Sequence, residues 1–250
     1  MNDMSGPKIV YHVVAPLELT IGPQELERRR AFLMRFADAG TEIEVRSPGE
    51  GRDSIESEWD VALMAPRIIN GLRKAQADSF DAGIIGCFSD PGMDAAREAV
   101  DMPLVGPGAA AVHLALQLGD RFSIISPSDD GAGRTRSNMR ALGVEGRLAS
   151  ARGMGLSVPE LAAADEAALD KIAKTAERCI SEDGAEVLIL GCMSMAFLDP
   201  TPGLVERLGV PVVNPIIAAL KMAEALHRLG LTHSRARWPA ARDKPHIAKQ

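Results

Sequence analysis

The sequence predicts an α/β fold of two similar lobes, each built on a parallel β-sheet with helices on both faces. Short apolar, β-branched runs alternate along the chain with longer stretches of helical periodicity, a pattern typical of parallel sheets. The chain also repeats itself. Residues 84–92 (IIGCFSDPG) and 187–196 (VLILGCMSMA) both pass from an apolar run into Gly-Cys, and aligning them brings 102–111 (MPLVGPGAAA) close to register with 210–219 (VPVVNPIIAA). We therefore expect a pseudo-twofold axis between the lobes.

Local signals predict each element of the first half. Residues 8–15 (KIVYHVVA) are β-branched and end at Pro16, and 41–46 (TEIEVR) alternates polar with apolar residues, so both are expected to be strands. Apolar residues at helical spacing predict a helix over 24–39, which Gly40 ends. The other expected elements are a polar loop at 47–60, a helix at 59–78, a strand at 82–86, a helix at 91–100 with Pro91 first and Ser89 or Asp90 as its cap, a strand at 102–105 and an Ala-rich helix ending near Leu118.

The second half repeats this alternation. Strands are expected at 121–126, 187–190 and 210–213, with one further strand around 145–149 in an ambiguous stretch; helices are expected at 130–142, 165–182, 203–208 and 216–229, and a loop at 157–161. The repeat predicts a first lobe of residues 1–106 plus 214–231 and a second lobe of 107–213. The polar, basic tail at 232–250 is expected to be ordered only if it docks on a neighbour.

Composition excludes several classes of protein. The net charge is -6 with a pI near 5.5, which disfavours nucleic-acid binding. No apolar run approaches the ~20 residues of a membrane helix, and the first residues lack the pattern of a signal peptide. Three cysteines without an export signal fit free thiols in a reducing compartment. We expect a cytoplasmic protein that acts on a small molecule and has neither a nucleic-acid nor a membrane partner.

The repeat places two thiols at the centre of the predicted site. Cys87 and Cys192 follow equivalent strands, and ligands of open α/β sheets bind at the carboxyl ends of strands, so both thiols should face one cleft. A cysteine between a strand and a helix is expected to have a pKa lowered toward neutrality. Gly86 and Gly191 allow a sharp turn and a close approach. Two such thiols can form a two-base system, in which a thiolate takes a proton from a carbon acid and the opposite thiol returns one. Loop N–H groups and four hydroxyls are candidates for holding the enolate: Ser89, Ser126, Ser128 and Ser194.

Other residues have plainer interpretations. Cys179 lies in a helical stretch and is expected to be a small core residue. Asp90 can be a helix cap or a chemical group, and the arginines at 134, 136 and 140 can form a solvated face or bind an anion. No cysteine has ligand spacing for a metal, and the compartment disfavours a disulfide. The GPG sequence at 106–108 lacks the spacing of a phosphate loop, and nothing indicates a nucleotide or pyridoxal phosphate site.

Several blocks resemble the hydantoin and allantoin racemases of the aspartate/glutamate racemase superfamily: GCFSDPGMDAAREAV, PLVGPGAAA, RFSIIS, DGAEVLILGCMSMA and GVPVVNPIIAALKMAE. The resemblance implies a cofactor-independent enzyme of two flavodoxin-like lobes that holds its substrate between two catalytic cysteines, here Cys87 and Cys192. It places Gly86, Phe88 and Ser89 on one wall and Met193 and Ser194 on the other. The full set of expected substrate-binding residues is Pro16, Gly86, Phe88, Ser89, Asp90, Pro107, Ser126, Ser128, Gly191, Met193, Ser194 and Asn214.

The chain departs from that family at the expected pocket wall. Residues 14–17 are VAPL where the family has Asn-Pro-Asn-Thr, 193–195 are MSM where it has Ala-Gly-Met, and 214–215 are NP where it more often has Asp-Gly. The leading hypothesis is a racemase or epimerase of a 5-substituted hydantoin or of allantoin. The alternatives are a cofactor-free decarboxylase, a maleate-type cis–trans isomerase, an aspartate/glutamate-type racemase and a non-catalytic binding protein. We also expect a homo-oligomer.

Overall fold

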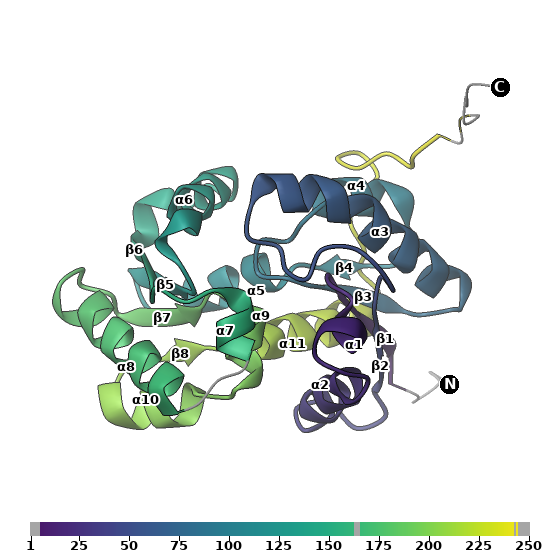
Figure 1. Ribbon diagram of the computed structural model, residues 1–250. Helices are drawn as coiled ribbons and strands as arrows, with labels where there is room; N and C mark the ends of the chain where they lie inside the picture. Colours follow the sequence, from purple (N-terminus) through teal and green to yellow (C-terminus); the bar gives the residue numbers. More distant parts are fainter. Residues whose placement is uncertain (1–5, 163–165, 243, 245–250) are drawn as a thin grey trace.

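The computed structural model describes residues 6–162, 166–242 and 244, and contains two four-stranded parallel sheets of identical topology. The strand order is β2-β1-β3-β4 in one sheet and β6-β5-β7-β8 in the other, so each lobe repeats the same winding (Figure 1). The strands are β1 Lys8–Val13, β2 Glu42–Arg46, β3 Ala82–Gly86, β4 Leu104–Val105, β5 Phe122–Ser126, β6 Leu148–Gly153, β7 Val187–Leu190 and β8 Val212–Val213. The two-lobed α/β fold predicted from the internal repeat is confirmed.

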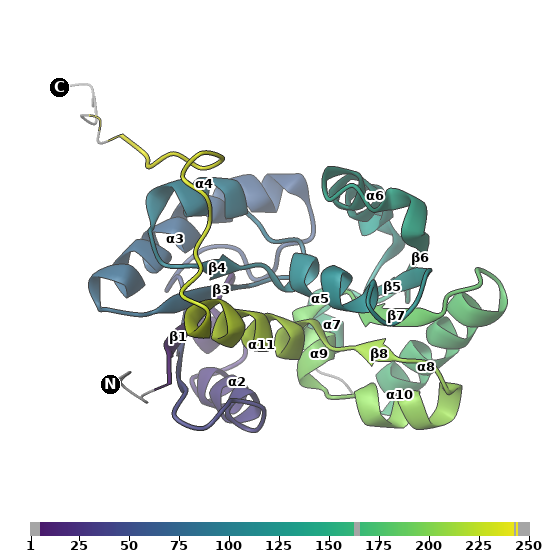
Figure 2. The same cartoon turned by 180° about the vertical axis from the view of Figure 1, so that it is seen from behind.

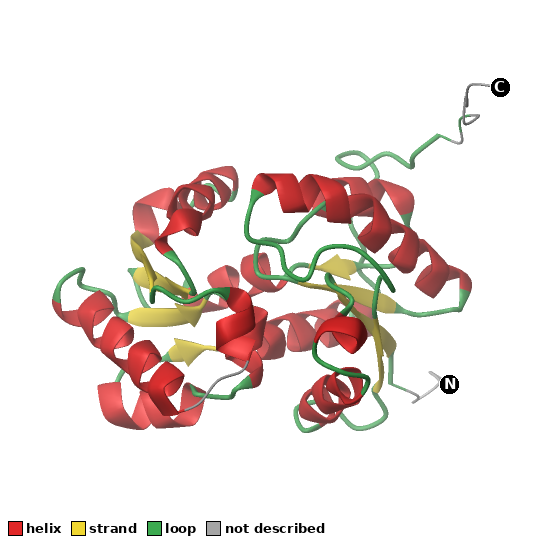
Figure 3. Ribbon diagram, viewed as in Figure 1, coloured by secondary structure: helices red, strands yellow, loops and turns green. Residues whose placement is uncertain are grey.

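Helices cover the sheets as the alternation of the sequence requires (Figure 3). Those of the first half are α1 Leu17–Thr20, α2 Gln24–Met34, α3 Glu58–Ala77, α4 Met93–Ala99 and α5 Pro107–Ala115. Those of the second half are α6 Ala132–Ala141, α7 Val158–Ala162, α8 Glu166–Ser181, α9 Met193–Phe197, α10 Thr201–Leu208 and α11 Pro215–Arg228. No helix among the described residues is both long and apolar enough to cross a membrane.

Strand β1 shows why both faces of a sheet need helices. Ile9, Tyr11 and Val13 pack into a core that continues into the second lobe, whereas Val10 and Val14 pack on the opposite side against α3 and α4. Alternate side chains of a strand point to opposite faces, so an apolar run is buried only when both faces are covered.

Helices α5 and α11 join the two lobes. Helix α5 leads from β4 into the second lobe and packs on β7, and α11 returns from β8 to pack on β3 and on α5 (Figure 2). On α11, Glu224 accepts hydrogen bonds from the Asp38 amide (2.7 Å) and the Thr41 hydroxyl (2.8 Å) of the first lobe. Helix α11 thus packs on the first lobe, as the predicted lobe of residues 1–106 plus 214–231 requires. The domain division itself stays a prediction.

Several boundaries differ from the expected ones. Helix α4 begins at Met93, not Pro91, because Gly92 takes a left-handed φ of 70° and Asp90 turns away with φ 49°. Strand β6 begins at Leu148, near the end of the expected 145–149, because residues 145–147 form a 3-10 turn. Residues 158–162 are helical where a loop was expected, and the helix α1 was not expected at all. Helix α2 ends at Met34, earlier than the predicted 39.

The described part of the tail docks on its own lobe. The Thr232 hydroxyl donates to the Asp101 carbonyl (2.8 Å), Arg235 donates to the Val100 carbonyl (2.7 Å) and the Trp238 indole donates to Asp94 on α4 (2.9 Å). The described part of the tail is therefore held by its own lobe, where docking on a neighbour was expected.

Candidate active site

A cavity of about 630 Å³ lies at the carboxyl ends of β3 and β7, and both lobes line it. Carboxyl ends of parallel strands are the usual ligand positions in α/β sheets. The expected site residues that line the cavity are Gly86, Cys87, Phe88, Ser89, Asp90, Ser126, Ser128, Gly191, Cys192, Met193 and Ser194. Residues more than a hundred positions apart in the sequence are therefore brought to one cavity by the repeat.

Cys87 follows β3 in a tight turn. Its amide donates to the Ile85 carbonyl (2.8 Å), and its Sγ lies 3.2 Å from the Ser89 hydroxyl. Gly86 is required immediately before it, because a Cβ there would come within 2.9 Å of the His12 carbonyl and of the Tyr11 ring and hydroxyl. The glycine lets β3 end directly against β1, as the expected close approach requires.

Cys192 occupies the equivalent position after β7, where it is the N-cap of α9. The Gly191 amide donates to the Ile125 carbonyl (2.7 Å), and a Cβ on Gly191 would come within 2.7 Å of that carbonyl and of the Ile124 side chain. Both Gly-Cys dipeptides therefore leave their strands through a glycine that is packed against the neighbouring strand.

The prediction that the pKa values of Cys87 and Cys192 are lowered toward neutrality is wrong. Burial raises the pKa of both thiols above its ordinary value, because a thiolate is poorly solvated in a largely apolar cavity. At Cys87 the hydrogen bonds with Ser89 oppose this effect; at Cys192 the Met195 and Ser194 N–H groups and the Arg29 charge do so. The helix start contributes in the expected direction, but desolvation is the larger effect.

Asp90 lines the cavity but caps a different helix from the one predicted. Its carboxylate accepts the Gly108 and Ala109 N–H groups (3.1 and 3.0 Å) at the start of α5. Burial raises the pKa of this carboxyl to about 7, against the lowering effect of the two N–H groups. The GPG sequence at 106–108 is explained by the same contact, since a Cβ on Gly106 would collide with the Asp90 carboxylate.

Three expected substrate-binding residues do not line the cavity: Pro16, Pro107 and Asn214. Pro16 is the N-cap of α1, and its neighbours Ala15 and Leu17 line the wall instead. Asn214 is 4% exposed and caps α11, accepting from the Ile216 N–H (3.1 Å) while its amide donates to the Ala196 carbonyl of α9 (2.9 Å). The proline Pro107 opens α5 one residue before the wall is reached.

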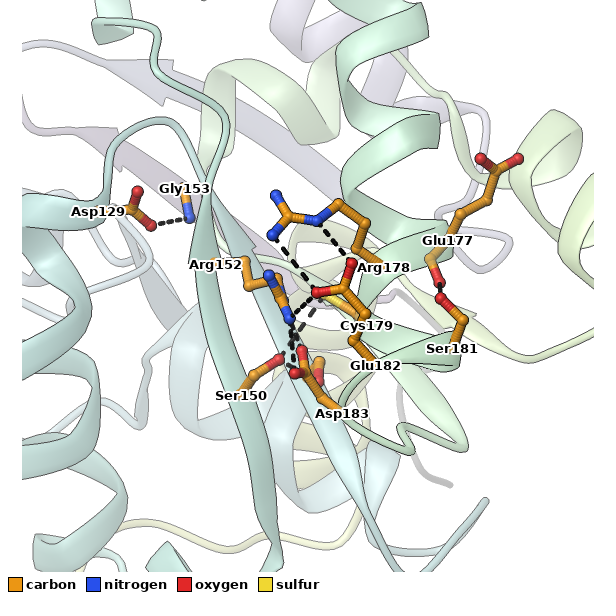
Figure 4. Close-up of polar contacts among 11 residues, drawn as sticks. Asp129, Ser150, Arg152, Gly153, Glu177, Arg178, Cys179, Ser181, Glu182 and Asp183 are labelled. Atoms are coloured by element: carbon orange, nitrogen blue, oxygen red, sulfur yellow. Dashed lines mark hydrogen bonds and ion pairs between the residues drawn. The ribbon is translucent and has the colours of Figure 1, made fainter.

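Cys179 lies away from the cavity, within the second lobe (Figure 4). It is fully buried, and the Ser150 hydroxyl donates to its sulfur (3.8 Å). Burial raises the pKa of this thiol. Beside it, Arg152 pairs with Asp183 (2.5 Å) and Glu182 (2.6 Å). Its position agrees with the structural role expected for it.

Three arginines line the cavity: Arg29, Arg97 and Arg134. Arg29 and Arg97 were not predicted, whereas Arg134 belongs to the run for which a solvated face or anion binding was expected. Arg29 on α2 is 3% exposed, and its place on the apolar side of that helix is the signal that could have revealed it. Arg134 on α6 lines the cavity and donates to the Glu56 carbonyl of the facing lobe (3.2 Å), whereas Arg136 and Arg140 are exposed. Arg134 therefore does not belong to the solvated face expected for α6.

The described residues contain no cluster of three or more His, Cys, Asp or Glu side chains arranged to hold a metal ion. Two thiols, several hydroxyls and loop amides at one cavity between two α/β lobes define the class of proteins with a small-molecule site at the carboxyl ends of parallel strands.

Comparison with known proteins identifies the family. The model of the family described as "Asp/Glu/Hydantoin racemase" matches residues 29–223, and the chain belongs to this family of isomerases. The hydantoin racemase of Paenarthrobacter aurescens is 36% identical over 198 residues, which are 79% of this chain and 83% of that one. The solved allantoin racemase from Klebsiella pneumoniae has a TM-score of 0.89 at 29% identity, with 97% of each chain covered. That from Pseudomonas fluorescens has a TM-score of 0.84 at 31% identity, covering 96% of this chain and 100% of the other. The family resemblance seen in the sequence is confirmed.

Proposed function

We propose that the protein is a cofactor-independent racemase of a small carbon acid, of the 5-substituted hydantoin or allantoin type. The observation that carries the proposal is that Cys87 and Cys192, at equivalent strand ends, line a single cavity. The substrate class is supported by the hydantoin and allantoin racemases to which the chain is similar.

In the proposed reaction, one cysteine thiolate removes the proton from the stereocentre and the opposite thiol donates a proton to the other face. The carbanion formed between these steps is an enolate, whose oxygen needs oriented donors. The hydroxyls of Ser89, Ser126, Ser128 and Ser194 line the cavity and are suited to that role. General acid–base catalysis of this kind contributes about 10²–10⁴-fold to the rate.

Burial of the thiols favours proton transfer of this kind. Desolvation raises both thiol pKa values, so a thiolate formed there is a stronger base than one in water. The carbon acid that the thiolate must deprotonate has a high pKa. Raising the thiol pKa therefore reduces the difference between the two pKa values. The raised pKa values are therefore compatible with the proposed chemistry, at the cost of a smaller thiolate fraction at neutral pH.

The cavity is large for a bare five-membered ring. Its volume of about 630 Å³ lies in the range of small-molecule sites, and it extends past the cysteines to the loop at 53–56 and to α6. We propose that the ring lies between the thiols and that the substituent extends toward α6. Arg134, Thr135 and Asn138 give that end a polar wall, which suits a substituent with hydrogen-bonding groups, as a ureide has.

The experiment is to incubate single enantiomers of substituted hydantoins, allantoin and aspartate with the protein in D₂O. Optical rotation and incorporation of deuterium at the stereocentre are followed together. The proposal predicts loss of rotation together with deuterium in the product. Absence of exchange with every carbon acid would overturn it. Parallel incubations with an arylmalonate and with maleate test the alternative reactions, by release of CO₂ and by cis–trans isomerisation.

Single cysteine variants test the two-base mechanism. Cys87→Ser and Cys192→Ser are each expected to lose racemisation by about 10²–10⁴-fold, while each keeps exchange with one enantiomer, and the preferred enantiomer is opposite in the two variants. Cys179→Ser, which changes a buried thiol away from the cavity, is the matched control and should keep activity within twofold. Full racemisation by either active-site variant contradicts the mechanism.

A further inference from the structure

We propose that Arg29 is a positioning residue that makes the cysteine pair unequal, so that the thiolate which starts the reaction forms at Cys192 and not at Cys87. This inference rests on the proposed racemase function. It goes beyond that function because a symmetric two-base mechanism requires no difference between the thiols.

Arg29 is a buried cation at the cavity wall. Only 3% of it is exposed, and its Nε donates to the Glu25 carboxylate (2.7 Å) one helical turn earlier. Glu25 is also shared with Arg28, whose Nε and Nη2 donate to it (2.7 and 2.8 Å). One carboxylate thus faces two guanidinium groups, so the cluster keeps a net positive charge. A buried charge that is not fully compensated is costly, and it has a strong effect on any ionisable group nearby.

The same guanidinium contacts the helix that carries Cys192. It lies over the ring of Phe197 on α9 at 4.5 Å, and that ring also packs against Phe32 (5.2 Å between centroids) and edge-on against Tyr11 (5.8 Å). Cys192 is the N-cap of this five-residue helix. The contact therefore fixes the charge relative to the helix whose first turn begins at the thiol.

The two thiols have charges of opposite sign around them. The Arg29 charge lowers the pKa of Cys192, together with the N–H groups of Met195 and Ser194, against the raising effect of burial. At Cys87, burial raises the pKa, the Ser89 hydrogen bond lowers it, and the Cys192 and Asp90 charges raise it further. When the pair holds one proton, that proton is therefore more stable on Cys87 than on Cys192.

The proton balance of the resulting cycle is simple. The Cys192 thiolate takes the proton from the substrate carbon and becomes a thiol, while the C–H electron pair becomes the enolate. The Cys87 thiol then gives its proton to the opposite face and becomes a thiolate. Transfer of one proton from Cys192 to Cys87, directly or through solvent, restores the protonation states with which the cycle began.

The test measures thiol ionisation without substrate. The full chain is treated briefly with iodoacetamide between pH 6 and 10, and the alkylation rate of each cysteine is read from its peptide by mass spectrometry, because the thiolate is the reacting form. Cys192 is expected to react with a lower midpoint than Cys87. Arg29→Met should raise the Cys192 midpoint by about one pH unit, a tenfold loss of rate near pH 7, and change Cys87 less than twofold.

Arg28→Met is the matched control. Arg28 shares Glu25 with Arg29, but about half of its side chain is exposed and it does not line the cavity. It should leave the Cys192 midpoint within a few tenths of a unit. Two further variants keep the test decisive if Arg29→Met does not fold. Arg29→Lys should keep most of the difference between the thiols, and Glu25→Gln, which removes the compensating carboxylate, should lower the Cys192 midpoint.

An unchanged Cys192 midpoint in folded Arg29→Met, or a midpoint for Cys87 below that of Cys192 in the wild type, overturns the inference. These outcomes are separate from the proposed function, because alkylation needs no turnover. If the wild type racemises its substrate but Arg29→Met leaves the alkylation profile unchanged, only the role of Arg29 is rejected. If Arg29→Met shifts the alkylation profile but the wild type does not racemise any substrate, only the proposed function is rejected.

Discussion

Asp90 shows how one residue links two parts of the site. It follows the Cys87 loop, takes a left-handed φ of 49° and caps α5, the helix that leads into the second lobe. Asp tolerates this conformation better than most residues. The left-handed backbone thus places the carboxylate where it accepts two hydrogen bonds from the start of α5.

The raised pKa of Asp90 predicts a pH dependence of stability. Burial raises the pKa of the carboxyl to about 7, so the folded chain binds this proton more tightly than the unfolded chain. The stabilisation is complete below about pH 4 and is lost as the pH rises through about 7. In Asp90→Asn, which carries no titratable group there, the free energy of unfolding should fall less than in the wild type between pH 5 and 8, by about 2–3 kcal/mol.

Urea denaturation at several pH values measures this difference. Asp130→Asn replaces an exposed carboxylate of the second lobe and should keep the wild-type pH dependence. Parallel curves for the wild type and Asp90→Asn would show that the carboxyl is ionised throughout the range, and would contradict the prediction.

At the scale of elements, the two Gly-Cys strand ends are the most constrained parts of the fold. Gly191→Ala would place a Cβ within 2.7 Å of the Ile124 side chain and of the Ile125 carbonyl, and within 2.9 Å of the Ser126 hydroxyl. Backbone cannot yield as a flexible side chain does, so β7 and Cys192 must shift. We expect a loss of about 1–3 kcal/mol in stability, typical of overpacking, and a loss of racemisation greater than tenfold.

Gly133→Ala is the matched control, because nothing lies within 4 Å of the added Cβ on the helix α6. Alanine is the better helix former by about 1 kcal/mol, so this variant should be slightly more stable than the wild type. Thermal denaturation and a racemisation assay decide both cases. Equal stability of Gly191→Ala and the wild type would mean that the strand end is looser than the close contacts indicate.

The strand ends were also the elements that the sequence predicted best. The strands β3 and β7 have the predicted bounds, because each is an apolar run between clear stop signals. The start of α4 could not be predicted, since the partner of Asp90 is a helix terminus 18 residues further along the chain. Helix α7 carried a local signal, a reciprocal pair in which the Glu160 amide donates to the Ser157 hydroxyl and the Ser157 amide donates to Glu160.

The same distinction separates the predicted from the unpredicted parts of the site. The cysteines, the glycines and the hydroxyls next to them could be predicted because they follow strands of a visible repeat. Arg29 and Arg134 reach the cavity from helices, and only the packing of the lobes decides which helical side chains do so. Asn214 was assigned to the wall by its place in the family pattern, but its side chain is used in capping α11 and holding α9.

The whole molecule is a pair of similar lobes joined on one side by buried packing and on the other by polar contacts. Phe197 of the second lobe packs against the Tyr11 and Phe32 rings and the Arg29 guanidinium of the first lobe, and the four side chains form a continuous interior. Across the cavity mouth, the Arg134 guanidinium donates to the Glu56 carbonyl (3.2 Å) and lies 4.0 Å from the Glu58 carboxylate, which is largely exposed. Apolar contacts hold their geometry better than exposed polar ones, so relative motion of the lobes should open the Arg134 side.

Arg134→Ala tests this difference between the two sides. Exposed polar contacts contribute about 0.2–1 kcal/mol each, so losing them should raise KM by about two- to fivefold through a wider opening of the cavity, with kcat changed less than KM. The wild-type KM should also rise with salt, because the contact is screened, whereas that of Arg134→Ala should not. Arg136→Ala, on the exposed face of the same helix, should behave as the wild type in both respects. An equal dependence on salt in Arg134→Ala and the wild type would show that the Arg134 contact is not the source of the salt effect, and would contradict its role as a bridge between the lobes.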